Sequence, residues 1–245
     1  MPIWQQVLDH LRRASGSVRG FRYFGTFWFG AWLLNLVHPL VGRLLRGRVL
    51  DLGGFRVRLG TTDCTCLVNL ACDYDLDFVR RHLPLVDMVI DAGANVGAFS
   101  YLVTRFSPDL RIIALEPERE NFRFLTQQPF AAHLDARRAA LGARAGTGSV
   151  CQGPNEATAT VAEGGGDDPV PIVTLAELCR GRTFVKLDIE GAERAILEDP
   201  LPEAITALAI EWHDPETLPD LCREGDWSLV TRDLFGNTCW SWERR

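Results

Sequence analysis

The chain has 245 residues, of which 47% are hydrophobic and 24% are charged. That composition is typical of one globular domain with an appendage, and it excludes a disordered or collagen-like protein. The formal net charge is -6, so no basic surface for phosphates is indicated and we expect no nucleic acid among the partners.

Cysteine and lysine usage add to this picture. The seven cysteines contain no C-x-x-C pair, which favours reduced thiols of a cytoplasmic protein over zinc ligands. Among 26 basic residues only Lys186 is a lysine. Arginine and lysine are not interchangeable, so we expect Lys186 to lie where a guanidinium would not fit or function as well as an ammonium.

The first predicted unit, residues 1–48, is a helical and partly apolar extension. Residues 23–42 contain no charged side chain and are long enough to cross a bilayer. Gly, Asn, His and Pro interrupt this segment, and arginines flank both of its ends. A membrane span is therefore the least favoured alternative. A helix in the membrane interface, with peripheral membrane contact through residues 23–42, and a helix packed on the core both stay open.

The second predicted unit, residues 49–85, leads into the main domain. Apolar and polar residues alternate around Gly53 and Gly54, which predicts a β-hairpin. Residues 61–83 are expected to be helical.

The third predicted unit, residues 86–245, is an open, doubly wound α/β domain. Short apolar runs alternate with amphipathic stretches, which indicates a parallel sheet covered on both faces. The expected strands are 86–91, 111–116, 183–188 and 207–212, and the expected helices are 98–106, 120–128 and 192–197.

Three further features of this domain are expected. Thr174 and Glu177 form a capping box at a helix start. The Gly-rich segment 142–169 is interpreted as a mobile excursion or a loose hairpin. Residues 227–245 are expected to form two antiparallel strands joined at Gly236 and Asn237, which would close one edge of the sheet.

The turn after the first strand of this domain is the candidate ligand site. Ligands of open α/β sheets bind beyond the carboxyl ends of the strands. Here the turn reads D-A-G-A-N-V-G from Asp91 to Gly97, and its glycines allow a ligand to approach the backbone closely. Glu116 ends the next strand, where an acid can accept both hydroxyls of a ribose.

These residues favour a nucleoside that carries an amino-acid tail. Asp91 can face an ammonium, the loop amides a carboxylate, and Glu116 a ribose. S-adenosylmethionine has these three groups. NAD is disfavoured, because Asn95 replaces the second glycine of the dinucleotide fingerprint. A nicotinamide-dependent oxidoreductase would therefore share only the fold with this protein.

Five segments together resemble the FkbM family of S-adenosylmethionine-dependent methyltransferases. They are VIDAGANVGAFS, LEPERENFRFL, AALGARAG, FVKLDIEGAERAIL and AIEWH, and the resemblance covers roughly residues 60–240. The most specific part is the run from Lys186 to Glu193. The resemblance implies a Rossmann-like class I methyltransferase fold, with a mostly parallel seven-stranded sheet and an antiparallel C-terminal hairpin. The implied reaction is methylation of an alcohol oxygen.

The resemblance also implies a set of cofactor-binding residues. The methionine end would be lined by Asp91, Gly93, Ala94, Asn95 and Gly97, and Asp188 could hold the methionine ammonium. Glu116 and Pro117 would bind the ribose. Ala140, within the segment 139–142, would lie at the adenine edge, although Arg138 stands where related enzymes often have an acid. Asn121 is interpreted either as helix support or as a cofactor contact.

The candidate catalytic residues follow the fourth and fifth strands of this domain. Asp188 is the leading candidate to orient or deprotonate the acceptor hydroxyl. Glu190 follows closely, and paired carboxylates can raise one pKa into the range of a general base. Lys186 shares the strand face of Asp188, which favours an ion pair that positions Asp188 or Glu190 over a direct role in substrate binding or catalysis. Glu193 either shares the face of Glu190 or caps the next helix.

Glu211 and His213 form a second constellation, with the i, i+2 spacing of one strand face. Either both reach the acceptor pocket, with His213 as a candidate base, or they bind each other or the backbone. Asp188, Glu190, Glu211 and His213 could assemble a divalent-metal site. The spacing does not require one, so no metal is expected.

The leading hypothesis is an O-methyltransferase that acts on a hydroxyl of a sugar, a glycan or a secondary metabolite. The alternative is a catalytically inactive binding or scaffolding protein of the same fold at the membrane surface. Its motivation is the apolar segment 23–42. The oligomeric state does not follow from the sequence.

Overall fold

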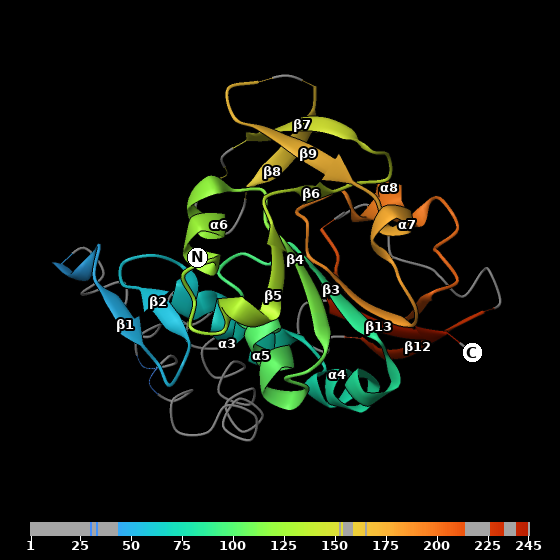
Figure 1. Ribbon diagram of the computed structural model, residues 1–245, viewed down its shortest axis with the longest axis horizontal. Helices are drawn as coiled ribbons and strands as arrows, with labels where there is room; N and C mark the ends of the chain where they lie inside the picture. The colour runs from blue at the N-terminus through green and yellow to red at the C-terminus, as the bar shows by residue number, and fades with distance from the viewer. Residues whose placement is uncertain are drawn as a thin grey trace, which may run out of the picture.

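The computed structural model describes residues 30, 33, 44–151, 153, 159–164, 166–213, 226–232 and 239–244 (Figure 1). Apart from residues 30 and 33, the apolar segment 23–42 lies outside this range, as does the turn expected at Gly236 and Asn237. Among the described helices, none combines the length and the apolar character that crossing a bilayer requires.

A seven-stranded sheet forms the centre of the molecule, with the strand order β12-β13-β11-β10-β3-β4-β5. Five of its strands pair in parallel, and the two C-terminal strands pair antiparallel at one edge. The parallel strands are β3 (Met88–Ala92), β4 (Arg111–Leu115), β5 (Leu134–Arg137), β10 (Thr183–Leu187) and β11 (Ile205–Glu211), and the edge strands are β12 (Trp227–Arg232) and β13 (Cys239–Arg244). This confirms the predicted class I methyltransferase sheet and its antiparallel edge.

Helices cover both faces of the sheet, because successive strand residues point to opposite sides. In β3, Val89 packs with one hydrophobic cluster, whereas Met88 and Ile90 pack with the other. The first cluster includes residues of α3 (Asp63–Asp73), α4 (Leu76–His82) and α5 (Ala98–Phe106). The second includes residues of α7 (Leu175–Leu178) and α8 (Glu193–Leu197), while α6 (Arg119–Leu125) packs near β4 and β5.

The elements before the main sheet agree with the sequence analysis. The strands β1 (Val49–Asp51) and β2 (Arg56–Arg58) pair antiparallel, and the Asp51 carboxylate accepts a hydrogen bond from the Gly54 amide in the turn. The helical stretch 61–83 is divided into α3, α4 and the short 3-10 helix η1 (Leu83–Leu85). Asp75 begins α4 by accepting a hydrogen bond from the Phe78 amide. The capping box of Thr174 and Glu177 is also present.

Of the two interpretations of segment 142–169, the hairpin is closer to the structure than the mobile excursion, because residues 146–151 and 160–163 pair as antiparallel strands. The segment contributes to a four-stranded sheet with the order β6-β9-β7-β8, which lies above the main sheet in Figure 1. Its strands are β6 (Ala140–Leu141), β7 (Gly146–Cys151), β8 (Thr160–Glu163) and β9 (Pro169–Val173).

Two features order this small sheet despite its glycines. Ala140, Val170 and Ile172 form a small buried cluster that supplies an apolar core. The Asp168 carboxylate also forms ion pairs with Arg119, at 2.6 Å, and with Arg138. Arg119 belongs to α6, so these ion pairs tie the small sheet to a helix of the main domain.

Candidate functional site

A cavity of about 400 Å³ lies at the carboxyl ends of the parallel strands. Its wall joins α3, the loop after β3, the ends of β4, β10 and β11, and parts of β6, β8 and β9. Of the residues expected at the cofactor and catalytic sites, nine line it: Gly93, Ala94, Asn95, Glu116, Pro117, Ala140, Lys186, Asp188 and Glu190. Asp91, Gly97 and His213 are not part of this lining.

Asp91 does not face the cavity as expected. Its side chain is fully buried, and Oδ2 accepts hydrogen bonds from the amide and the hydroxyl of Ser100, at 3.1 and 2.6 Å. Oδ1 lies 3.5 Å from Lys186 Nζ. Asp91 therefore faces an ammonium, but it is the ammonium of this chain's own lysine.

The loop glycines act through the backbone. Gly93 has a φ of 73°, and a Cβ at this position would lie 1.7 Å from the carbonyl oxygen of Asp188. Only glycine lets the loop after β3 pass this close to the end of β10. Gly97 also has a positive φ, and its hydrogen atoms face Leu125 and Phe130, so its role is packing and not the lining of the cavity.

Glu116 lies at the end of β4 and is almost fully buried. Its Oε2 accepts a hydrogen bond from the Asn95 amide at 2.7 Å, and its Oε1 accepts one from the Glu118 amide at 2.8 Å. Each carboxylate oxygen keeps acceptor capacity beyond these bonds. Burial raises the pKa of Glu116 to about 7.

Lys186 links the two ends of the site. It is 4% exposed, and its Nζ donates a hydrogen bond to the Gly93 carbonyl at 2.7 Å. The same atom lies 3.1 Å from Asp188 Oδ2. Burial alone would lower the pKa of Lys186, but the charges of Asp188 and Asp91 outweigh it and raise the pKa above its ordinary value. The lysine is thus a buried cation that fixes Asp188, as the sequence analysis favoured.

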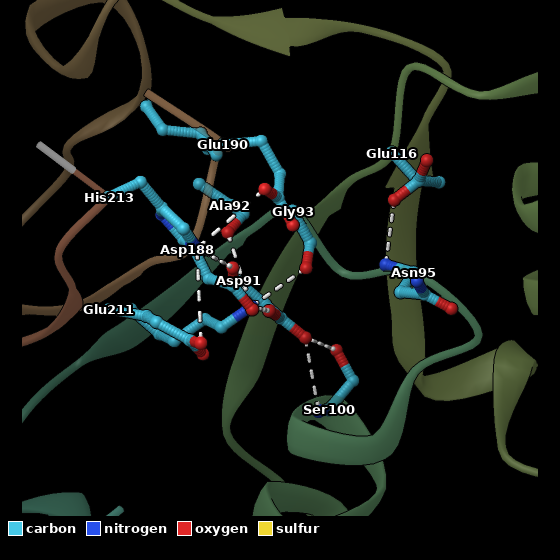
Figure 2. A network of polar contacts seen from close by, with 12 residues as sticks. Asp91, Ala92, Gly93, Asn95, Ser100, Glu116, Asp188, Glu190, Glu211 and His213 are labelled. Atoms are coloured by element: carbon cyan, nitrogen blue, oxygen red, sulfur yellow. Dashed lines mark hydrogen bonds and ion pairs between the residues drawn. The ribbon is translucent and has the colours of Figure 1, made fainter. Parts of the chain in front are cut away.

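Asp188, Glu190, Glu211 and His213 gather on one side of the Gly93 loop, whereas Glu116 and Asn95 lie on the other (Figure 2). His213 Nε2 lies 3.9 Å from Asp188, 3.7 Å from Glu190 and 3.8 Å from Glu211. Glu190 has a positive φ of 56°, a conformation that non-glycine residues seldom adopt outside functional sites.

Crowding of carboxylates in this cluster shifts its pKa values. Burial, and then the charge of Asp188, raise the pKa of Glu211 to about 8. Burial also raises the pKa of Glu190. For His213, burial would lower the pKa, but the hydrogen bond and the charge of Glu193 raise it to about 9.

The link between Glu193 and His213 escaped the sequence analysis. Glu193 is 1% exposed and accepts hydrogen bonds from the amides of Ile189 and Gly191, both at 3.0 Å. Its Oε1 also lies 2.9 Å from His213 Nδ1. Glu193 therefore orients the imidazole and directs Nε2 toward the other carboxylates. The two residues are 20 positions apart on different elements, so no local pattern could have paired them.

The wall contributed by α3 was also missed. Cys66, Asn69 and Leu70 line the cavity from one face of α3, and Tyr74, the residue after the helix, lines it too. Burial and the nearby charges of Asp63 and Asp188 raise the pKa of the Cys66 thiol. The Tyr74 hydroxyl is buried and has no hydrogen-bond partner among the described residues. Asn121 also lines the cavity, and its Oδ1 accepts a hydrogen bond from Arg58.

The residues of the cavity fit the ribose and the base of an adenosyl ligand. Glu116 offers a buried carboxylate to two hydroxyls, and Ala140 with Ile172 offers an apolar wall for a base. The volume is within the range of ligand pockets, about 300–1,000 Å³. Asp188, with one oxygen engaged by Lys186, leaves the other oxygen to the cluster around His213.

Residues 91–223, more than half of the chain, match a family model described as the Methyltransferase FkbM domain. A comparison with curated proteins found no significant match. Among solved structures, the methyltransferase FkbM from Methylobacillus flagellatus is 18% identical, with a TM-score of 0.40. The alignment covers 90% of this chain and 62% of that protein.

Two further solved structures are comparably distant. A putative RNA methyltransferase from Pyrococcus horikoshii is 13% identical, with a TM-score of 0.42, and 86% of this chain aligns with 98% of it. A human methyltransferase 10 domain containing protein is 11% identical, with a TM-score of 0.43, and 86% of this chain aligns with 96% of it.

Proposed function

Because the chain belongs to the FkbM methyltransferase family, whose members use S-adenosylmethionine, we propose that it methylates a hydroxyl oxygen of a sugar, a glycan or a secondary metabolite. The observation that carries this proposal is one continuous cavity, lined by Glu116 at the cofactor end and by Asp188, Glu190 and Glu211 at the other. Carboxylates can orient a hydroxyl group and accept its proton.

The cofactor end holds the ligand through backbone and carboxylate contacts. S-adenosylmethionine supplies a methyl group on a sulfonium. Glu116 accepts the ribose hydroxyls, with its carboxylate held in place by the amides of Asn95 and Glu118. Pro117 and Ala140 line the same part of the cavity.

The acceptor end divides orientation and proton removal between two carboxylates. Asp188 is held by Lys186 at 3.1 Å, so its charge is balanced and its position is fixed. Asp188 therefore orients the acceptor hydroxyl. Glu190 lines the cavity next to Asp188 and would take the hydroxyl proton while the methyl group passes from sulfur to oxygen, with the carbon–sulfur bond breaking and S-adenosylhomocysteine as the leaving group. This division assigns Asp188 the first of its two expected roles, orientation of the hydroxyl, and gives proton removal to Glu190.

The test begins with calorimetric titration of the purified protein with S-adenosylmethionine and S-adenosylhomocysteine, with NAD as a control ligand. Methyl transfer from isotopically labelled S-adenosylmethionine to a panel of sugars, glycans and hydroxylated metabolites follows. We expect both adenosyl ligands to bind, and we expect the labelled methyl group in a methyl ether of the acceptor. Label found only on nitrogen or carbon atoms would overturn the assignment of the acceptor atom.

Variants separate the two ends of the cavity. Glu190→Gln is expected to lower kcat by about 100-fold or more while cofactor affinity stays within a few-fold of wild type. Exposed Glu198→Gln is the matched control. Unchanged turnover in Glu190→Gln would show that another group takes the proton.

A further inference from the structure

Three side chains from the ends of two neighbouring strands converge with the spacing of metal ligands. One ligand atom each of Asp188, Glu211 and His213 lies within 4.8 Å of the other two. His213 Nε2 lies 3.9 Å from Asp188 Oδ1 and 3.8 Å from Glu211 Oε1. Ligands bound at about 2.0–2.3 Å to one ion lie roughly 3–4.5 Å apart, so side-chain movements of a few tenths of an ångström would complete the site.

The imidazole is held as metal-binding histidines usually are. Such histidines typically engage a carboxylate through the ring nitrogen that does not bind the metal. In this protein His213 Nδ1 lies 2.9 Å from Glu193, which is 1% exposed and is itself held by two backbone amides. Nε2 is therefore the atom directed toward Asp188 and Glu211.

A second and independent observation comes from Tyr74, the residue that follows α3. Tyr74 lines the same cavity, is 4% exposed, and has a hydroxyl with no hydrogen-bond partner among the described residues. Asp188 and Glu211 are among the charged groups that act on it. Buried hydroxyls in proteins nearly always have a partner, so this unpaired hydroxyl indicates a ligand atom in the cavity.

The charges around the site also favour a cation. Lys186 is occupied by Asp91 and Asp188, and His213 is surrounded by Asp188, Glu190, Glu193 and Glu211. Five carboxylates thus share Lys186 and, when it is protonated, His213, and a bound metal ion would replace the proton of His213 Nε2. Buried carboxylates are ordinarily balanced by paired cations or by a metal ion.

We propose that Asp188, Glu211 and His213 bind one divalent cation of the Mg²⁺ or Mn²⁺ type, with Glu193 as the positioning residue for His213. Carboxylate oxygens suit both ions, whereas an imidazole nitrogen suits a transition metal, so the ligand set favours Mn²⁺ over Mg²⁺. Asp188 serves two cations, with Oδ2 on Lys186 and Oδ1 on the metal ion. The cation binds an acceptor oxygen and lowers its pKa, a role that rests on the proposed function, whereas the binding of the ion does not.

The test is a titration of chelator-treated full-length protein with Mn²⁺, in which electron paramagnetic resonance measures the free ion. We expect one Mn²⁺ per chain. Glu211→Gln should weaken Mn²⁺ binding at least tenfold, and exposed Glu203→Gln should leave it unchanged. Glu193→Gln should also weaken it and alter the signal of the bound ion, as expected of a residue that acts through His213. Circular dichroism and the urea midpoint check that each variant is folded.

The outcomes separate this proposal from the proposed function. Absence of Mn²⁺ binding by wild type, or equal binding by wild type and folded Glu211→Gln, would overturn the cation site. Methylation of a hydroxyl at an unchanged rate in excess chelator would remove the cation's role and leave the proposed function standing. Conversely, Mn²⁺ binding that requires Glu211, together with methylation only on nitrogen or carbon, would keep the cation site and refute the hydroxyl acceptor.

Discussion

At the residue scale, Glu116 combines two properties that make cofactor binding sensitive to pH. It is buried, which raises its pKa to about 7, and its proposed role requires a carboxylate that accepts two hydroxyls. A raised pKa in the folded state means that the proton is lost as the pH rises through about 7. The ionised form, and with it the affinity for S-adenosylmethionine, should therefore increase from pH 6 to pH 8.

Calorimetry at several pH values measures this effect. Glu116→Gln should bind S-adenosylmethionine at least tenfold more weakly at pH 8, and its affinity should vary less with pH. Glu120→Gln, an exposed neighbour on α6, should behave like wild type. If the affinity for S-adenosylmethionine varies with pH in the same way in wild type and Glu116→Gln, the titrating group is not Glu116.

The same proton affects stability with the opposite sign. Between the ordinary carboxyl pKa and about 7, the folded protein holds a proton on Glu116 that the unfolded chain has released. In the absence of cofactor, this contribution to the free energy of unfolding is fully present below the ordinary pKa and is lost as the pH rises through about 7. Urea unfolding of wild type and Glu116→Gln should reveal it as a difference in slope against pH.

Alanine substitutions at Gly93 and Gly191 together separate the cost of backbone strain from the cost of steric overlap. Gly93→Ala places a Cβ 1.7 Å from the Asp188 carbonyl oxygen at a φ of 73°. We expect it to lower the free energy of unfolding by about 3 kcal/mol or more. Gly191 has a φ of 110° and open space around its Cβ position. Gly191→Ala should therefore cost only the conformational term, about 1–2 kcal/mol, and equal losses would mean that the close approach at Gly93 is unimportant.

At the scale of elements, the small sheet of β6 to β9 covers part of the cavity and is tied to α6 through Asp168. The hydrogen bonds from Arg119 and Arg138 lower the pKa of Asp168. The two ion pairs of Asp168 are therefore present at neutral pH and are lost as the pH falls through that lowered pKa. Asp168→Asn should speed amide hydrogen exchange in β7 and β9 several-fold. Asp167→Asn, at the exposed neighbouring position, should not. Unchanged exchange in Asp168→Asn would show that the apolar cluster alone orders the sheet.

How far the sequence predicts these elements depends on the range of their interactions. The strands at 88–92, 111–115 and 183–187 are continuous apolar runs, so local pattern was enough to find them. The strands β7 to β9 are short and lie in a Gly-rich segment, so the local pattern indicated only a mobile excursion or a loose hairpin and did not show that they form a sheet with β6. Asp91 was placed correctly at a strand end, but the sequence does not show that the Lys186 ammonium stands in front of it.

At the scale of the whole molecule, Lys186 joins the central sheet to the candidate catalytic carboxylates. It lies on β10 beside β3 and contacts Asp91, Asp188 and the Gly93 carbonyl. Lys186→Met leaves the carboxylate of Asp91 buried without its cation. Removing one partner of a buried ion pair typically costs about 3–5 kcal/mol, and we expect a loss of that size in the free energy of unfolding.

Urea unfolding checks this expectation. The double variant Lys186→Met with Asp91→Asn should recover part of the loss, because Asn carries no charge. If the double variant is as unstable as the sum of the single variants, the two side chains do not act as a pair.

Because Lys186 is the single lysine of the sequence, chemical labelling of lysine can measure how often this buried side chain becomes accessible. An acylating reagent that attacks side-chain amines has one target in this sequence, and the target is 4% exposed and neighbours two carboxylates. The ammonium must leave its partners and lose its proton before it reacts. The rate at which Lys186 is acylated therefore measures how often its side chain leaves the two carboxylates, and a ligand that fills the cavity slows that labelling without touching the lysine.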